Sequence, residues 1–241
     1  MKTSLKDTIQ KEYAETLAPA VTATVSPEAE ALVTVDDRFF NNEDMVGDFD
    51  RSDIKVPSLN LCQAVGPLST KFTPGQFVWN KEEVIGDQNN PIHVTVRRMR
   101  KYFQEKLPYG SETLPRRFDS EKEARAAGLA MSWDKIPGAG IFERVVDCEV
   151  YIRGTKEKNP TWSLIAGEPT TAARLTLKGT SYSAAQSFIT AASYNLREGM
   201  HHGIFEIRSS REKFGTNMVW VPKVRLIGRH TPEAAAEIHS L

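Results

Sequence analysis

Apolar and polar residues alternate in short runs along much of the chain, and a period of two predicts β-strands. One such run, "HVTVRRMRKYFQEK" at residues 93–106, opens with Val94 and Val96 on one face. Another follows a Pro-Gly turn in "FTPGQFVWN". Strand-like runs cover residues 54–65, 72–80, 91–99, 144–154, 161–167, 172–179, 202–209 and 217–228.

Three helices are expected among these strands. Ser120, with Glu123 three residues later and Gly128 beyond, predicts a short helix. Residues 181–194 have apolar positions at helical spacing, and Thr231 followed by Pro232 predicts a terminal helix. Strands and helices do not alternate regularly, which argues against a doubly wound nucleotide-binding fold.

The predicted fold class is therefore mostly β with inserted helices (α+β). We expect an antiparallel curved sheet or a small OB-like barrel, with the helix at 181–194 packed on it. Pro222 lies inside the last strand pattern, so that strand is expected to be an edge or to carry a bulge.

Charge divides the chain into two parts. Residues 1–53 contain five Lys or Arg and twelve Asp or Glu, a net charge of −7, and the rest contain 26 and 19, a net charge of +7. We predict an acidic, largely flexible leader at 1–53 with a possible short helix, and a single β-rich binding domain at 54–241. The asymmetry indicates a polyanionic partner, an acidic segment that competes with one, or a leader that only increases solubility.

The sequence lacks the signatures of several classes of protein. No apolar run reaches the roughly 18 residues that span a bilayer, and the N-terminus has no signal-peptide pattern. Two lone cysteines fit a reducing cytoplasm. The phosphate-binding loop, the dinucleotide fingerprint, the nucleophile elbow and the Cys-x-x-Cys pair are all missing. We therefore predict a non-enzymatic protein without cofactor or metal.

The run at 93–106 combines cations and aromatic rings. As a strand it places Arg98, Arg100 and Tyr102 on one face, continuing the register of Val94 and Val96. As a helix its apolar stripe leaves the cations outside. Cations that follow phosphates, beside rings that stack on bases, are how proteins hold single-stranded nucleic acid. The plain alternative is a charged edge strand protected against aggregation. The predicted contacts here are Arg97, Arg98, Arg100 and Lys101 to phosphate, and Tyr102 and Phe103 to bases.

Weaker signals of the same kind occur elsewhere. Lys178 precedes the helix at 181–194, whose first N–H groups can attract a phosphate, although N-capping by Thr180 or Ser181 is the simpler explanation of that pattern. The further predicted contacts are Lys71, Phe77, Trp79, Arg116, Arg117, Lys178, Arg211 and Lys213.

Two acidic residues suggest a different chemistry. Asp147 and Glu149 alternate with Cys148 and Val150 and so share one strand face. A pair of carboxylates can hold the Mg²⁺ of a nuclease, while the plain reading is the solvated face of a strand. His201 and His202 are the only histidine cluster in the sequence, and adjacent strand residues point to opposite faces.

Two segments resemble a broad group of phage-encoded proteins. "VPSLNLCQAVGPLS…FTPGQFVW", residues 56–79, is similar to the opening of that group, and "LKGTSYSAAQSFITAA", residues 177–192, is similar to its later helix. Some members are similar to phage single-stranded DNA-binding proteins of OB type. The resemblance implies an OB-type fold and a role in phage replication or recombination. The acidic segment of such proteins is usually C-terminal, whereas here it is N-terminal.

The leading hypothesis is a non-catalytic single-stranded DNA-binding protein of the cytoplasm, with RNA not excluded. Its acidic leader is expected to compete for the binding surface or to recruit a replication or recombination protein. The alternative is an oligomeric structural, virion-associated or scaffold protein whose leader docks on the basic surface of a neighbouring copy. A metal-dependent nuclease using Asp147 and Glu149 is the third hypothesis.

Overall fold

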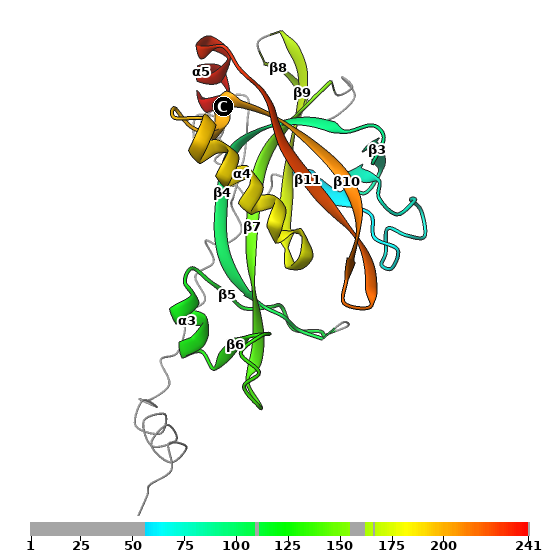
Figure 1. Ribbon diagram of the computed structural model, residues 1–241, viewed down its shortest axis with the longest axis vertical. Coiled ribbons are helices and arrows are strands. Elements are labelled where there is room, and N and C mark those ends of the chain that lie inside the picture. Colours follow the sequence, from blue (N-terminus) through cyan, green and yellow to red (C-terminus); the bar gives the residue numbers. More distant parts are fainter. Residues whose placement is uncertain (1–55, 109–110, 155–161, 166, 241) are drawn as a thin grey trace, which may run out of the picture. The chain divides into compact units, whose positions relative to one another are not determined.

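The structure, a computed structural model, describes residues 56–108, 111–154, 162–165 and 167–240. The predicted leader at 1–53 lies outside the described residues. Figure 1 shows strands that form one curled sheet with a long helix on its concave side. The strands are β1 (Ser58–Leu61), β2 (Phe77–Trp79), β3 (Glu83–Gly86), β4 (Ile92–Glu105), β5 (Arg117–Phe118), β6 (Leu129–Met131), β7 (Gly140–Arg153), β8 (Trp162–Ile165), β9 (Glu168–Lys178), β10 (Gly203–Phe214) and β11 (Asn217–Arg229). The helices are α3 (Glu121–Ala126), η3 (Gly179–Ser181), α4 (Tyr182–Asn195), η4 (Met200–His202) and α5 (Pro232–Ser240).

The sheet is mixed and forms a half-barrel. Its strand order is β11-β10-β4-β7-β9-β1-β2-β3, with β5, β6 and β8 added to β4, β7 and β9. Most neighbours are antiparallel, whereas β1 pairs with β9 and β6 pairs with β7 in parallel. The expected α+β class with a curved sheet and one packed helix is confirmed. Pro222 lies in β11, which ends the strand order, so the expected edge position is also confirmed.

One face of the sheet, called here the inner face, is covered by α4. The helix buries small residues, Ala184, Ala185 and Ala192, which let it approach the strands closely. Phe188 reaches farther and meets Phe205 of β10 edge-to-face, with ring centroids 5.0 Å apart. Both rings are fully buried, and burial of such a side chain contributes about 2–3 kcal/mol. The inner face therefore forms the main core.

A β-bulge divides β4. Val96 pairs with Val150 of β7, and Arg98 pairs with Glu149, so Arg97 is the extra residue of the bulge. The strand continues to Glu105, which decides for a strand over the helical alternative beyond Val96. The extra residue reverses the alternation of faces, and every residue from Arg98 onward lies one position out of phase with Val94 and Val96.

The far ends of β4 and β7 carry a second, smaller core. Phe103 and Phe142 pack edge-to-face there, with ring centroids 5.7 Å apart. Ala124 of α3 and Leu129 and Met131 around β6 complete this cluster. Ser120 caps α3 by accepting a hydrogen bond from the Glu123 N–H at 3.2 Å, as the sequence predicted. The two 14-residue strands thus pass from the main core into a separate one.

The edge strand β11 is connected to the segment after β1 by one side chain. The Gln63 amide donates to the Trp220 carbonyl at 2.8 Å and accepts from the Trp220 N–H at 3.0 Å. Gly75 provides the space for the Trp220 ring, because a Cβ there would lie 2.8 Å from it. The backbone groups of Trp220 that face away from β10 are therefore paired, and the curl of the sheet is held partly closed.

Candidate nucleic-acid interface

The predicted basic strip on β4 lies on the outer face of the sheet, opposite α4. Arg98, Arg100 and Tyr102 do share one face, but it is the face opposite to Val94 and Val96, because of the bulge at Arg97. The prediction of a common register with the two valines was therefore wrong. Lys101 and Phe103 lie on the inner face together with Met99.

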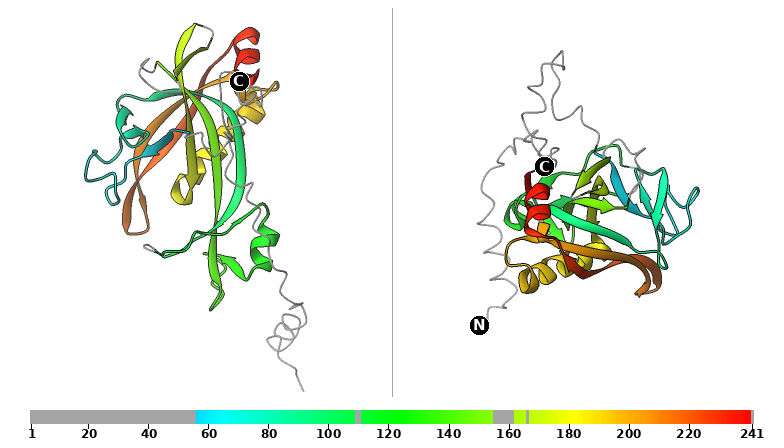
Figure 2. Two further views of the ribbon diagram at one scale, coloured as in Figure 1. Left: turned by 180° about the vertical axis from the view of Figure 1, so that it is seen from behind. Right: turned by 90° about the horizontal axis from the view of Figure 1, so that it is seen from above.

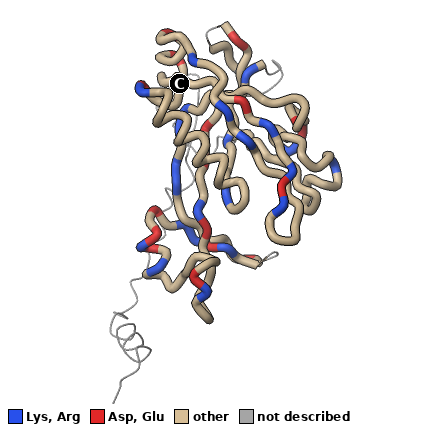
Figure 3. The backbone as a smooth tube through the Cα atoms, in the orientation of Figure 1, with Lys and Arg blue, Asp and Glu red and all other residues tan. Residues whose placement is uncertain are grey.

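Cross-strand neighbours give the outer face balanced charges. Arg98, Glu149, Arg174 and Ser58 form one row across β4, β7, β9 and β1. Figure 3 shows the positive stretch of β4 beside β7, on which positive and negative residues alternate. An interleaved surface of this kind attracts a polyanion less than its count of cations suggests.

Most of the cations predicted on or near β4 have acidic partners. Arg97 contacts Glu149 at 3.2 Å, and Arg100 contacts Asp119 at 3.1 Å. Arg116 holds Glu105 through two hydrogen bonds, of 2.9 and 3.1 Å, and this pairing lowers the pKa of the Glu105 carboxyl. Lys178, at the start of the helical region, contacts Glu143 at 3.2 Å. A phosphate would have to compete with these carboxylates.

The rings expected to stack on bases lie in the interior. Phe77 is 0% exposed, and Trp79 and Phe103 are also buried. Rings with so little accessible surface cannot stack on a base in this structure, so the stacking role predicted for them is not supported. These rings lie at the alternating strand positions that face the core. The sequence alone did not distinguish a buried ring from an exposed one.

Tyr102 is buried on the outer face and connected to charged neighbours. The Arg117 guanidinium lies 5.2 Å from its ring centroid. Burial, with the nearby Asp147 carboxylate that accepts its hydrogen bond, raises the pKa of Tyr102 to about 12. The phenol therefore stays neutral and donates to Asp147, which makes it a structural group more than a base-stacking platform.

The two carboxylates of the nuclease hypothesis have protein partners. Asp147 is 2% exposed and accepts a hydrogen bond of 2.6 Å from the Thr176 hydroxyl. Burial raises the pKa of Glu149, against the opposing effect of Arg97 and Arg98. Among the described residues, no group of three or more His, Cys, Asp or Glu is arranged to hold a metal ion. His201 lies against the rings of His202 and His239.

A different basic and aromatic surface forms where the loop at 62–76 lies beside the β10–β11 hairpin (Figure 2). We call it the hairpin–loop surface. Arg211 pairs in register with Trp220, and Lys213 with Met218, two residues closer to the hairpin tip. Its cations are Lys71, Arg211 and Lys213, and its rings are Phe72 and Trp220, while Phe214 follows Lys213 in β10 and so faces the other side of the hairpin.

The cations of the hairpin–loop surface make no ion pair with the acidic residues that the structure describes. Lys71, Arg211 and Lys213 are exposed, and none makes an ion pair within the part of the chain that the structure describes. The Lys71 ammonium lies 5.2 Å from the Phe72 ring centroid. Phe214 is 41% exposed, and Trp220 and Phe72 are partly exposed. The sequence predicted the three cations and missed Trp220, whose position opposite an arginine becomes visible only from the hairpin register.

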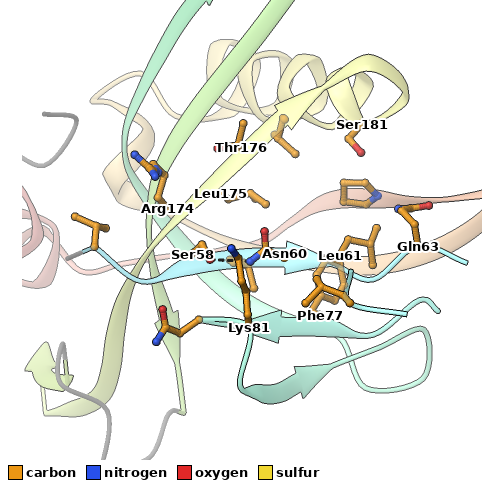
Figure 4. A pocket seen from close by; sticks show the side chains of 16 residues that line it. Ser58, Asn60, Leu61, Gln63, Phe77, Lys81, Arg174, Leu175, Thr176 and Ser181 are labelled. Carbon is orange, nitrogen blue, oxygen red and sulfur yellow. Dashed lines mark hydrogen bonds between the residues drawn. The ribbon is translucent and has the colours of Figure 1, made fainter. Parts of the chain in front are cut away.

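A pocket of about 630 Å³ lies next to this surface. Figure 4 shows it between β1 and β9, with Arg174 and Thr176 on one side and Ser58, Asn60 and Lys81 on the other. Gln63 and Pro222 also line the pocket. Gln63 is hydrogen-bonded to Trp220, and Pro222 lies two residues after Trp220 in β11. None of its residues except Phe77 belongs to the predicted site, because they come from segments far apart in the chain.

None of the helices in the described ranges is long and apolar enough to cross a membrane. Comparison of the chain with protein-family models, with curated proteins and with solved structures finds no match.

Proposed function

We propose that this chain is a non-catalytic single-stranded DNA-binding protein that acts in phage-like DNA replication or recombination in the cytoplasm. The observation that supports the proposal most is the hairpin–loop surface, where three exposed cations, which make no ion pair with any described residue, lie near the partly exposed rings of Phe72 and Trp220. Single strands are bound in this way, because cations hold the phosphates and each stacked base contributes roughly 1–3 kcal/mol.

In this proposal Arg211 and Lys213 contact successive phosphates along one side of the hairpin. Trp220, opposite Arg211 on the neighbouring strand, offers its partly exposed ring to a base. Lys71 and Phe72 extend the same surface across the loop. The strip on β4 contributes less, because Arg97 and Arg100 already have carboxylate partners.

Fluorescence anisotropy of a labelled single-stranded oligonucleotide, measured across a salt series, tests this proposal. The double variant Arg211→Glu with Lys213→Glu is expected to weaken binding at least about tenfold. It should also reduce the slope of log K against log salt by about 1.4, the value for two phosphate contacts on a single strand.

Two matched charge reversals complete that experiment. Lys106→Glu with Lys122→Glu changes two exposed lysines away from the hairpin and is expected to leave the salt slope nearly unchanged. Arg98→Glu with Arg100→Glu tests the β4 strip. If that variant alone loses binding, the strip and not the hairpin–loop surface is the interface. If the full chain does not bind at low salt, the DNA-binding proposal is wrong.

The partition of charge supports a second candidate, an oligomeric scaffold in which the acidic residues 1–53 of one copy contact the basic remainder of another. Salt screens such charge–charge contacts, with a screening length of about 8 Å at physiological ionic strength, so they weaken as salt is added. Light scattering of the full chain should then show an oligomer that dissociates at high salt and upon deletion of residues 1–53. A monomer at all salt concentrations excludes this candidate.

A further inference from the structure

The pocket between β1 and β9 exists because these two strands separate. They pair only at Ser58 with Arg174 and at Leu59 with Leu175, and then diverge. The gap exposes outer-face residues such as Asn60 and inner-face residues such as Leu61 to the same space (Figure 4). Its volume of about 630 Å³ is within the range of sites that hold small organic ligands.

Two cations line this space, and one of them, Arg174, stands in register with Glu149 of β7. Lys81 and Arg174 line the pocket, and neither side chain makes an ion pair or a hydrogen bond within the described ranges of the chain. No Asp or Glu is among the described residues that line it. Figure 4 shows Lys81 reaching from its turn toward Ser58 and Asn60 of β1, with Arg174 on the neighbouring strand. The pocket therefore selects for an anion.

The remaining lining combines apolar walls with uncommitted polar atoms. Leu61 and Leu177 supply apolar surface. Ser181 at the start of α4 makes no capping hydrogen bond with its hydroxyl. Asn60 donates to the Ser58 hydroxyl at 2.7 Å, which leaves its carbonyl oxygen to accept from a ligand. A fatty chain would leave these groups unpaired, whereas a planar heterocycle with polar edges would satisfy them.

The turn that presents Lys81 is unusual. Glu82 N–H donates to the Trp79 carbonyl at 3.0 Å, and Asn80 and Lys81 have φ values of 49° and 61°. Asn80 and Lys81 are thus the left-handed central residues of a β-turn in a three-residue loop, since Trp79 pairs with Glu83, and the second central position of such a turn strongly favours glycine. A lysine there adopts a conformation that L-residues rarely take, and such outliers cluster at ligand sites.

We propose that this pocket binds a nucleoside monophosphate, with its phosphate on Lys81 and Arg174 and its base between Leu61, Leu177 and the polar groups of Asn60 and Ser181. The ligand has two sources with the same chemistry: a free nucleotide, or one nucleotide unit of a strand held on the hairpin–loop surface. The second source rests on the proposed function. Gln63 and Pro222 connect the pocket to that surface through Trp220.

Isothermal titration of the full chain with thymidine monophosphate, and separately with thymidine, tests the site. The monophosphate is expected to bind at least about tenfold more tightly, because only it carries the charge that the cations recognise. Equal affinity of the two, or no heat with the monophosphate up to about 5 mM, overturns the proposal.

Lys81→Gly provides a sharp variant, since it removes the ammonium group and relieves the left-handed backbone at once. The variant is expected to bind the monophosphate at least fivefold more weakly than the unmodified chain does. The Tm of the variant should stay equal or rise by about 2–4 °C. Lys135→Gly is the matched control, because Lys135 also has a positive φ, of 49°, and does not line the pocket. It should change Tm in the same direction and leave binding unchanged. Lys81→Met keeps the strained backbone, so binding by this variant at the level of the unmodified chain would contradict the role of the charge.

The same variants in the oligonucleotide assay separate the two sources. If Lys81→Gly weakens the binding of both the monophosphate and the oligonucleotide, the pocket takes a unit of the bound strand. If it weakens only the binding of the monophosphate, the ligand is a free nucleotide, and the site is established whether or not the chain binds DNA. If the monophosphate does not bind but Arg211→Glu with Lys213→Glu still weakens the oligonucleotide, the pocket proposal is wrong and the proposed function stands.

Discussion

Glu149 shows how one residue can be held by an ion pair and still be costly to ionise. Its contact with Arg97 and the proximity of Arg98 favour the carboxylate, yet burial outweighs them and raises its pKa. One carboxylate oxygen, Oε1, has no hydrogen-bond partner in the structure. A buried pair of this kind is weak evidence for stability, because the desolvation of the charge offsets the attraction.

The pH dependence of stability follows from that shift. Well below pH 4.5, its ordinary pKa, Glu149 is protonated in both the folded and the unfolded chain. As the pH rises, the unfolded chain ionises first, so the free energy of unfolding falls until the pH exceeds the raised folded-state pKa. Glu149→Gln cannot titrate, so its stability relative to the unmodified chain is expected to rise as the pH increases from the ordinary carboxyl pKa to the raised folded-state pKa. Urea unfolding at several pH values measures this.

An exposed carboxylate provides the control for Glu149→Gln. Glu112→Gln removes the same charge from an exposed position and should give a difference in stability that changes little with pH. If the difference for Glu149→Gln is also constant, or falls as the pH rises, the buried carboxylate is not the residue that titrates.

At the scale of the element, β4 shows where the sequence was informative and where it was not. Alternation identified its first part as a strand, and the core valines were correctly placed. The bulge could not be predicted because Arg97 and Arg98 are both polar, so either register satisfies the pattern on that side. Because of the bulge, Met99 lies on the face of the core valines and Arg100 lies on the opposite face, the reverse of what the alternation predicted. Only the pairing with β7 reveals this.

Deletions in β4 test the bulge. Removing Arg97 restores regular pairing, since Arg98 already faces Glu149, so the fold is expected to persist with a Tm lower by several degrees. Removing Met99 instead forces either Arg98 or Arg100 opposite Cys148 on the core face. An unpaired charge buried there costs several kcal/mol, so this deletion is expected to unfold the chain. Circular dichroism during heating compares the two, and equal Tm values would contradict the assigned register.

At the scale of the described molecule, the sheet is completed by contacts between distant segments. Strand existence, helix positions and fold class could be predicted, because each depends on local periodicity. The pocket and the hairpin–loop surface could not, because they depend on which strands become neighbours. Lys81, Arg174 and Ser181, for example, belong to three separate elements or turns and meet only through the pairing of β1 with β9.

Gln63 offers a test of this long-range closure. Gln63→Ala removes two hydrogen bonds to the Trp220 backbone across a separation of 157 residues. The free energy of unfolding is expected to fall by about 1–3 kcal/mol, and the Trp220 amide should exchange with solvent faster. Ser69→Ala, which removes one local hydrogen bond in the same loop, is the control. Unchanged amide exchange in Gln63→Ala would show that the contact does not hold β11.

The parallel pair of β1 with β9 also has a consequence for how the chain folds as it is made. Ser58 cannot pair with Arg174 until about 116 further residues have left the ribosome, which takes roughly 6–23 s at ordinary rates of synthesis. The small β1–β2–β3 meander must wait during this time with its apolar side uncovered, since α4 and β9 do not yet exist. Ribosome-bound chains that end before β9 should therefore be the species most dependent on chaperones, and those that end after α4 should be much less so.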